Sequence, residues 1–262
     1  MEKLDTQRII GTIATSKRYS AVSPKTIAHI VTQFAAKHSS EQKVLDESKN
    51  LLHRIWGAYY STRPNFQKLK AKVLENEVSL SDITRIHFST SERAEFASDM
   101  YKNIYEKTNF PKRIADFGCG LNPLLAMQQP FASSLEQYDA FDIDIEEVEF
   151  LNATFSHTGQ KNFSAAVGDL LHMQSFTTYD AIFLLKVLPV VEMIEKGSTE
   201  RILRSLKARF LVISFPAGSL SQHKQNMGSF YEAEFTQRLT AIKKEYEILR
   251  YPTEIIFIVM NS

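Results

Sequence analysis

Apolar residues recur at helical spacing in the first third of the chain. Within 25–37 the three- and four-residue repeat runs through Ile27, Ile30, Val31 and Phe34. Pro24 suits the first turn of this helix, and Ser23 is a good cap for it. The same spacing predicts a second helix over 42–60 and a third one after Pro64. The first third is therefore expected to be helical.

The pattern changes after residue 112, where short apolar runs alternate with helical stretches. The expected strands are 113–117, 137–143, 162–167, 179–185 and 210–215, with helices at 147–155 and 199–206 among the segments between them. Two last strands, 247–250 and 255–260, flank a turn through Pro252. This alternation predicts an α/β fold with a parallel sheet and an antiparallel C-terminal edge. We expect residues 1–84 to form a helical module and 85–262 the α/β domain.

A helix start is expected just ahead of the first strand. Ser89 or Thr90 with Glu92 has the pattern of a cap for a helix that continues over 94–105. Alternatively, the hydroxyl pair and the following Arg93 could clamp a ligand carboxylate. The spacing by itself favours the capped helix.

A glycine turn follows the first expected strand. Ile114, Ala115 and Phe117 lead into Gly118-Cys-Gly120, and Pro123 then suits the first turn of a helix. Two glycines allow positive φ and a close approach of the backbone to a ligand. Strand, glycine turn and helix form the geometry of a nucleotide-type cofactor site, although one such turn fits any loop between a strand and a helix.

The second expected strand ends in carboxylates. Asp142 follows Gly120 by 22 residues, where an acid can accept hydrogen bonds from both ribose hydroxyls of an adenosine. Asp142 and Asp144 could instead both cap the next helix; we assign Asp142 to the ribose and Asp144 to the cap. The third glycine of the dinucleotide fingerprint and a phosphate-binding G-x-x-x-x-G-K-[ST] motif are absent, which disfavours NAD and ATP. The D-x-G-C-G motif with a later acid resembles the S-adenosylmethionine site of Rossmann-like methyltransferases.

Composition excludes several classes of protein. The 262-residue chain, 44% of it hydrophobic, suits one large domain or a catalytic domain with an appendage. No run of about 18 apolar residues occurs, and the charged first eight residues lack the apolar segment of a secretory signal. A single cysteine, and no cluster of Cys and His at ligand spacing, predict neither a disulfide nor a metal. We therefore expect a cytoplasmic protein without a membrane partner.

The net charge of +1 hides an asymmetry along the chain. Residues 1–80 carry 13 Lys and Arg against 7 Asp and Glu, whereas residues 81–262 carry 18 against 23. A basic first third suggests contact with a polyanion, and an ordinary solvated helical surface explains the same composition equally well.

Five ordered stretches are more specific than the glycine turn alone. They are Ile55-Trp-Gly-Ala-Tyr-Tyr60 leading into Arg63-Pro-Asn-Phe66, Ile86-His-Phe-Ser-Thr-Ser-Glu-Arg93, Asp116-Phe-Gly-Cys-Gly-Leu-Asn-Pro-Leu124, Leu184-Leu-Lys-Val-Leu-Pro189 and Val212-Ile-Ser-Phe-Pro-Ala-Gly-Ser-Leu220. Together they resemble the aminoglycoside-resistance 16S rRNA (guanine-N7) methyltransferases. The resemblance covers about residues 40–260.

The resemblance implies a Rossmann-like class I methyltransferase that uses S-adenosylmethionine and acts on guanine 1405 of 16S rRNA in the assembled 30S subunit. It implies resistance to 4,6-disubstituted aminoglycosides. Arg93 would hold the methionine carboxylate, Asp142 the ribose and Asp169 the adenine amino group. The full set of implied cofactor contacts is Phe66, His87, Ser89, Thr90, Arg93, Gly118, Gly120, Asp142, Asp169, Leu170 and Leu185.

No general base is expected, because guanine N7 has a lone pair and carries no proton. Lys186 is expected either to contact RNA phosphate or the target base, or to form a structural ion pair. The target base must leave its stack to reach the methyl group. We expect the basic module to dock on rRNA phosphates through Lys68, Lys70 and Lys72. The alternatives are methylation of a neighbouring adenine at N1, a non-catalytic ribosome-binding protein and a small-molecule methyltransferase.

Overall fold

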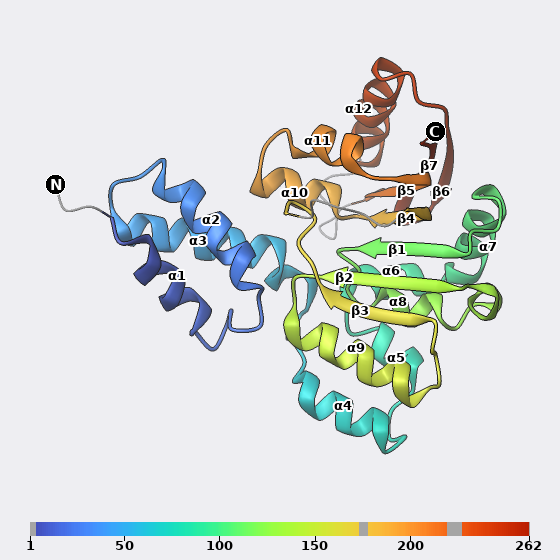
Figure 1. Ribbon diagram of the computed structural model, residues 1–262, viewed down its shortest axis with the longest axis horizontal. Helices are drawn as coiled ribbons and strands as arrows, with labels where there is room; N and C mark the ends of the chain where they lie inside the picture. The colour runs from blue at the N-terminus through green and yellow to red at the C-terminus, as the bar shows by residue number, and fades with distance from the viewer. Residues whose placement is uncertain (1–3, 173–177, 219–226, 262) are drawn as a thin grey trace.

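Three helices form a bundle at the start of the chain. The computed structural model describes residues 4–172, 178–218 and 227–261. The bundle consists of α1 (Thr6–Ala14), α2 (Pro24–Ala35) and α3 (Glu41–Ile55). Their apolar faces pack on one another, and the bundle projects from the sheet (Figure 1). None of the helices within the described ranges is long and apolar enough to cross a membrane.

The remaining helices of the first third pack elsewhere. Helix α4 (Phe66–Leu74) contacts α9 (Ile145–His157), and the short α5 (Leu80–Thr84) contacts α8 (Asn122–Ala126). Figure 1 shows α4 on the far side of α9 from the sheet, away from the bundle. The helices up to α3 therefore pack on one another, whereas α4 packs on the α/β domain. This change comes before residue 84, where the boundary between the helical module and the α/β domain was expected.

A seven-stranded sheet carries the rest of the fold, which confirms the predicted class. The strands are β1 (Arg113–Phe117), β2 (Gln137–Asp142), β3 (Phe163–Val167), β4 (Tyr179–Leu185), β5 (Ala208–Pro216), β6 (Tyr246–Tyr251) and β7 (Glu254–Met260). Their order is β3-β2-β1-β4-β5-β7-β6, with β1 to β5 parallel and β6 and β7 antiparallel. Each strand matches an expected segment to within two residues at either end.

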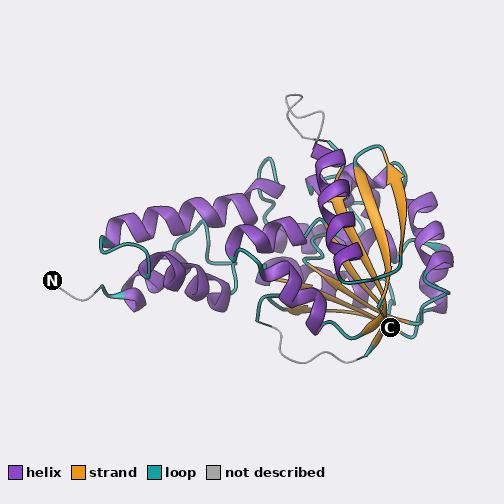
Figure 2. Ribbon diagram, turned by 90° about the horizontal axis from the view of Figure 1, so that it is seen from above, coloured by secondary structure: helices purple, strands orange, loops and turns teal. Residues whose placement is uncertain are grey.

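Helices cover both faces of the sheet (Figure 2). One face packs against α10 (Leu188–Ile194), α11 (Ser198–Ser205) and α12 (Met227–Ala241) and shares its apolar core with the bundle. The other face packs against α7 (Ala97–Lys107), α8 and α9, and its core includes side chains of α4. Because both faces are covered, the central strands β1, β4 and β5 are mostly apolar, with Asp116 of β1 and Ser214 of β5 as buried polar residues.

The structure corrects two predicted helices. The helix expected over 42–60 ends at Ile55; Trp56 leaves the helical conformation, and a 3-10 turn, η1 (Gly57–Tyr59), follows. The helix start expected at Ser89 or Thr90 is also wrong, because α6 (Phe88–Ala94) begins one residue earlier and ends before α7. In both cases a side chain bonds to a distant element: the Trp56 indole N–H donates to Asp144, and Glu92 pairs with Lys186 instead of completing a cap.

Candidate functional site

The candidate site lies where the sheet order reverses. Strands β2 and β3 lie on one side of β1, and β4 and β5 lie on the other. The carboxyl ends of these parallel strands meet at one edge of the sheet, and ligands of open α/β sheets bind in the crevice at such a reversal. A cleft occurs at this edge, and its lining combines loops after β1 to β4 with residues of α2, α3, η1, α6 and α10.

The glycine turn forms the floor of this cleft. Gly118 and Gly120 have φ values of 62° and 49°, a backbone conformation that favours glycine. A Cβ on Gly118 would lie 2.5 Å from Val187 Cγ2, and one on Gly120 would lie 3.0 Å from the His87 ring. The backbone N–H of Gly118 donates to the carbonyl of Phe141 at 2.8 Å, which ties the turn to β2. Both glycines are therefore required by conformation and by packing.

Asp142 stands at the end of β2, directly beside the turn. Its carboxylate accepts from the backbone N–H of Gly120 at 2.9 Å and from that of Asp144 at 3.1 Å. Burial and the neighbouring Asp144 charge raise the pKa of Asp142 to about 6, while the N–H of Gly120 opposes that rise. A carboxylate has about four lone-pair sites, so two remain for hydroxyl groups in the cleft.

Two further acids follow Asp142. Asp144 accepts from the backbone N–H of Glu147 and caps α9, which confirms the predicted cap. Arg63 binds the same carboxylate at 2.8 Å. The buried Glu147 accepts from the hydroxyl of Tyr60, and its other oxygen has no hydrogen-bond partner in the described part of the chain. The cleft thus holds a buried carboxyl oxygen that the described protein groups leave unpaired.

His87 forms one wall of the cleft. Its ring stacks on Tyr59 with 5.4 Å between centroids, and Tyr60 meets it edge-on at 5.0 Å. Its Nδ1 lies 3.1 Å from the hydroxyl of Thr90. Burial, with the nearby charge of Arg93, lowers the pKa of His87 to about 3, so its imidazole is neutral near pH 7. His87 therefore acts as a flat, uncharged surface.

Arg93 reaches the cleft from α6 as a completely buried guanidinium. Its Nε and Nη2 donate to the two oxygens of Glu254 at 3.1 and 2.8 Å, and its Nη1 donates to Asn122 Oδ1 at 2.8 Å. Three of its five N–H groups are used, and one remains on each terminal nitrogen. This remaining pair suits a bidentate bond to a ligand carboxylate.

Lys186 follows β4 in a left-handed conformation, with φ of 59°. Its ammonium lies 2.7 Å from Glu92 and 3.7 Å from Glu254, and the side chain is 9% exposed. The expected structural ion pair is thus present, and Lys186 also lines the cleft. A non-glycine residue in this conformation costs of order 1–3 kcal/mol, and such strain collects at functional sites.

The far end of the cleft combines one acid with apolar walls. Asp169 follows β3, is 9% exposed and accepts from the backbone N–H of Leu171 at 3.0 Å. Leu170, Leu185 and Val190 line the cleft around it. Apolar cleft walls with a carboxylate acceptor suit a purine ring with an exocyclic amino group.

These features fit a nucleoside that carries an amino-acid tail. The cleft lining combines an acceptor for ribose hydroxyls, apolar walls with a second acid, and an arginine with two N–H groups that no described residue uses. No group of His, Cys, Asp and Glu in residues 4–172, 178–218 and 227–261 could hold a metal ion. A family model described as ribosomal RNA methyltransferase (FmrO) matches residues 15–258.

The chain belongs to the FmrO family of ribosomal RNA methyltransferases.

This assignment confirms the resemblance seen in the ordered motifs. A Serratia marcescens protein named 16S rRNA (guanine(1405)-N(7))-methyltransferase is 29% identical over 260 residues, which cover 97% of each chain. A Frankia casuarinae protein of the same name is 28% identical over 265 residues, which cover 96% of this chain and 92% of the relative.

The FmrO-family fold also matches solved structures over nearly its full length. The 16S rRNA methyltransferase RmtF in complex with S-adenosyl-L-homocysteine superposes with a TM-score of 0.84 at 23% identity, covering 100% of this chain and 99% of that one. The methylase RmtB superposes with a TM-score of 0.82 at 24% identity and 99% coverage of each chain.

Most residues expected at the cofactor site of this FmrO-family chain line one cleft. They are His87, Ser89, Arg93, Gly118, Gly120, Asp142, Asp169, Leu170 and Leu185. Phe66 and Thr90 do not line it. Phe66 is buried against Phe150 and Tyr60, one layer behind the wall, and Thr90 is buried behind His87. Of the last family motif, Ser219 and Leu220 lie outside the described residues.

The sequence interpretation missed several cleft residues from the first third. Thr26, Trp56, Tyr59 and Tyr60 line the cleft, and so does Glu147. For Trp56, Tyr59 and Tyr60 the signal was present, since they make up one of the family motifs. Thr26 had no such signal, because it reads as an ordinary polar position on an amphipathic helix.

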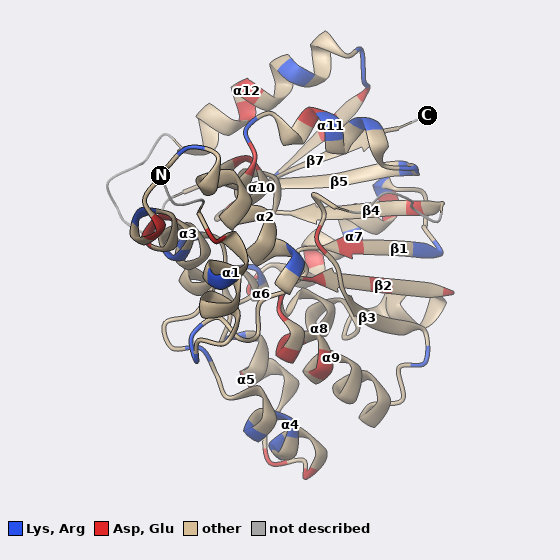
Figure 3. Ribbon diagram, turned by 60° about the vertical axis from the view of Figure 1, so that its left-hand side comes forward, with Lys and Arg blue, Asp and Glu red and all other residues tan. Residues whose placement is uncertain are grey.

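The lysines expected to bind rRNA lie on α4. Lys68 and Lys72 are exposed and lie on one side of α4, whereas Lys70 is half-buried and projects from the opposite side of the helix. In Figure 3 the ribbon is blue at Lys and Arg positions of α4 and of the bundle helices α1 and α3. The basic character of the first third is therefore spread over two separate surfaces.

Proposed function

We propose that this chain transfers a methyl group from S-adenosylmethionine to N7 of guanine 1405 of 16S rRNA in the assembled 30S subunit. The observation that carries the proposal is the family match over residues 15–258, on a chain whose cleft fits a nucleoside with an amino-acid tail. The names of the Serratia marcescens and Frankia casuarinae relatives supply the nucleotide and the atom.

Each part of the cofactor has a partner in the cleft. Gly118 and Gly120 let the backbone approach it, and Asp142 accepts from the ribose hydroxyls. Asp169 accepts from the adenine amino group. The two free N–H groups of Arg93 bind the methionine carboxylate. His87, between Tyr59 and the glycine turn, closes the wall beside the reacting centre.

The reaction requires alignment more than proton transfer. The bound cofactor supplies a methyl group on a positively charged sulfur. Guanine N7 carries no proton, so the chain needs no general base, and the neutral, packed His87 is consistent with that. The residues of the cleft orient the two reactants and exclude water, and such orientation is worth several kcal/mol or more. Lys186 stands at the mouth of the same cleft.

The substrate must be presented by docking and base flipping. Exposed Lys68 and Lys72 share one side of α4 and give it a positive surface suited to phosphates, and half-buried Lys70 adds its charge from the opposite side. A guanine stacked within an rRNA helix cannot reach the cleft, so it leaves the stack before reaction. Docking therefore supplies affinity, and the cleft selects the base.

The test is methylation of purified 30S subunits with methyl-labelled S-adenosylmethionine, followed by mapping of the labelled nucleotide. Label at N7 of guanine 1405 supports the proposal, and Asp142→Ala is the inactive control. Label at adenine N1 nearby would replace the proposal with the neighbouring-base alternative. Tight binding of 30S subunits without label would indicate a non-catalytic protein. A parallel reaction with free 16S rRNA tests whether the assembled subunit is required. If it is required, the free rRNA should take up little or no label.

A further inference from the structure

Helix α2 of the bundle reaches the purine end of the cleft. The Thr26 hydroxyl, which is buried, donates to Asp169 Oδ2 at 2.6 Å across 143 residues of sequence. Asp169 itself follows β3 in a segment without regular secondary structure. Its carboxylate is therefore held by its neighbours and not by a helix or strand of its own.

A second contact from α2 reaches the same carboxylate through two histidines. Gln33 Nε2 lies 2.8 Å from His29 Nε2, His29 Nδ1 lies 3.1 Å from His172 Nε2, and His172 Nδ1 lies 3.1 Å from Asp169 Oδ2. An amide nitrogen only donates, so His29 Nε2 accepts. His29 Nδ1–H then donates to His172 Nε2. The other ring nitrogen of His172, Nδ1, lies 3.1 Å from Asp169 Oδ2.

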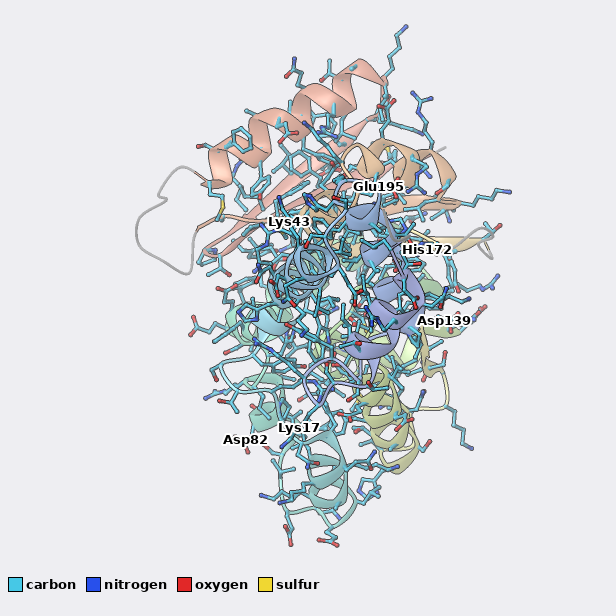
Figure 4. All side chains as sticks on the ribbon, turned by 90° about the vertical axis from the view of Figure 1, so that its left-hand side faces the viewer. Lys17, Lys43, Asp82, Asp139, His172 and Glu195 are labelled. Atoms are coloured by element: carbon cyan, nitrogen blue, oxygen red, sulfur yellow. The ribbon has the colours of Figure 1, made fainter. Side chains whose placement is uncertain are left out.

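Two charged side chains, Glu195 and Arg201, lie beside the two histidines. Glu195 Oε2 lies 3.5 Å from His29 Nε2, and the other oxygen of this carboxylate, Oε1, accepts from Arg201 at 2.7 Å. In Figure 4, which looks along the bundle toward the sheet, His172 and Glu195 lie near one another behind the bundle helices. Burial and the proximity of His172 lower the pKa of His29, which favours the neutral ring that the assignment requires.

The result is a carboxylate held at both oxygens. Asp169 Oδ2 accepts from the Thr26 hydroxyl and lies 3.1 Å from His172 Nδ1, and Oδ1 accepts from the N–H of Leu171. The fixed donors set the rotation of the carboxylate, so the remaining lone pair of Oδ1 has a defined direction. A single directed acceptor discriminates strongly between a purine with a 6-amino group and one with a 6-oxo group.

We infer that Thr26 is a positioning residue for cofactor selection, supported by the His29–His172 pair: α2 orients Asp169 and so makes the bundle part of the adenine-recognition site. This inference rests on the proposed function, because it requires an adenosine-containing cofactor in the cleft. It assigns the bundle a role in cofactor selectivity in addition to any role in docking.

The experiment measures the affinity of the full-length chain for two ligands by calorimetry. S-adenosyl-L-homocysteine carries the 6-amino group, and S-inosyl-L-homocysteine carries an oxygen in its place. Thr26→Val keeps the shape and removes the hydroxyl, and it should weaken the first ligand about tenfold with little effect on the second. Thr26→Ser keeps the hydroxyl and should restore the selectivity. Thr32→Val is the matched control on the same helix, because the Thr32 hydroxyl bonds only to the carbonyl of Ala28.

His172→Phe should lower the selectivity in the same direction by a smaller factor, since Thr26 still holds the carboxylate. Equal weakening of both ligands in Thr26→Val, or selectivity unchanged from the native chain, would overturn the inference. The proposed function fails separately, if the native chain binds neither ligand and does not label 30S subunits.

Discussion

Glu254, the first residue of β7, holds the guanidinium of Arg93 on α6 through hydrogen bonds of 3.1 and 2.8 Å. Both side chains are buried, at 0% and 1% exposure. Burial alone would raise the pKa of Glu254, but the charges of Arg93 and Lys186 lower it below its ordinary value, so the pair is ionised. Arg93 is thus locked in one orientation, with its free N–H groups directed away from Glu254.

This pair predicts that loss of Arg93 affects stability and binding separately. Arg93→Ala should lower the free energy of unfolding by about 3–5 kcal/mol, because Glu254 is left buried without its partner. The double variant Arg93→Met/Glu254→Gln removes both charges and should recover most of that stability. It should still bind S-adenosyl-L-homocysteine about tenfold to a hundredfold more weakly, because the carboxylate loses a charge-assisted pair. Denaturant unfolding and calorimetry measure the two effects.

A ligand without the carboxylate provides the control for Arg93. The double variant should bind 5′-methylthioadenosine, which lacks the amino-acid tail, as well as the native chain does. If both ligands weaken equally in a well-folded double variant, Arg93 is only structural and does not touch the methionine carboxylate.

The second prediction concerns pH and Asp142. Its pKa is raised to about 6 by burial, so its contribution to stability is present below its unfolded pKa and is lost as pH rises through about 6. Acid therefore does not unfold the chain through this group. Ligand binding has the opposite dependence, because protonation removes an acceptor for the ribose. Affinity for S-adenosyl-L-homocysteine should be constant from pH 7 to 8 and fall about tenfold per pH unit below 6.

Asp142→Asn is the control for this pH dependence. It should bind weakly at pH 7.5 and show no further loss in acid. The control is needed because burial also raises the pKa of Asp116 to about 6. A native chain whose affinity does not change between pH 5 and 8 would contradict the assignment of Asp142 to the ribose.

Local patterns were enough to predict the framework of the site. The strands, the glycine turn and Asp142 follow from short-range signals: apolar runs, glycines that permit positive φ, and an acid one strand-helix-strand unit further on. Because β1 and β2 are paired and parallel, the turn after β1 and the acid at the end of β2 lie side by side. No contact with a more distant part of the chain is needed to bring them together. The sequence therefore predicted the strands and the turn on this side of the cleft, and the role of Asp142 stays a prediction.

The other side depends on contacts between residues far apart in sequence. Trp56 ends its helix early because its indole bonds to Asp144, 88 residues away. Arg93 was expected to be available for a ligand, but it is shared with Glu254, 161 residues away. Neither partner could be identified from spacing, since the choice depends on which strands and helices become neighbours in the folded chain.

The third prediction concerns α4. Changing Lys68, Lys70 and Lys72 together to Gln should weaken binding to 30S subunits and reduce the slope of log affinity against log salt by up to about three units, if all three contact phosphates. Binding of S-adenosyl-L-homocysteine should not change, because none of the three lines the cleft.

The matched control for α4 changes Lys102, Lys161 and Lys207 to Gln. These exposed lysines carry the same total charge, and the last two lie within two residues of the amino ends of β3 and β5, at the edge opposite the cleft. This triple variant should bind 30S subunits as the native chain does. An equal loss in both triple variants would mean that net charge, and not the α4 surface, governs docking.

The last prediction connects the site to a cellular phenotype. A methyl group on guanine N7 adds positive charge and bulk and removes an acceptor, where 4,6-disubstituted aminoglycosides place a ring against that guanine. These drugs are cations, so the modified base both repels and obstructs them. Drugs with the 4,5-disubstituted pattern, such as neomycin, do not use that contact. Expression in a susceptible bacterium should therefore raise the inhibitory concentration of gentamicin and kanamycin and leave that of neomycin nearly unchanged. Asp142→Ala, expressed to the same level, should abolish the effect.

Resistance to neomycin and apramycin instead would indicate methylation of adenine N1. Resistance that survives in Asp142→Ala would mean that the phenotype does not depend on methyl transfer.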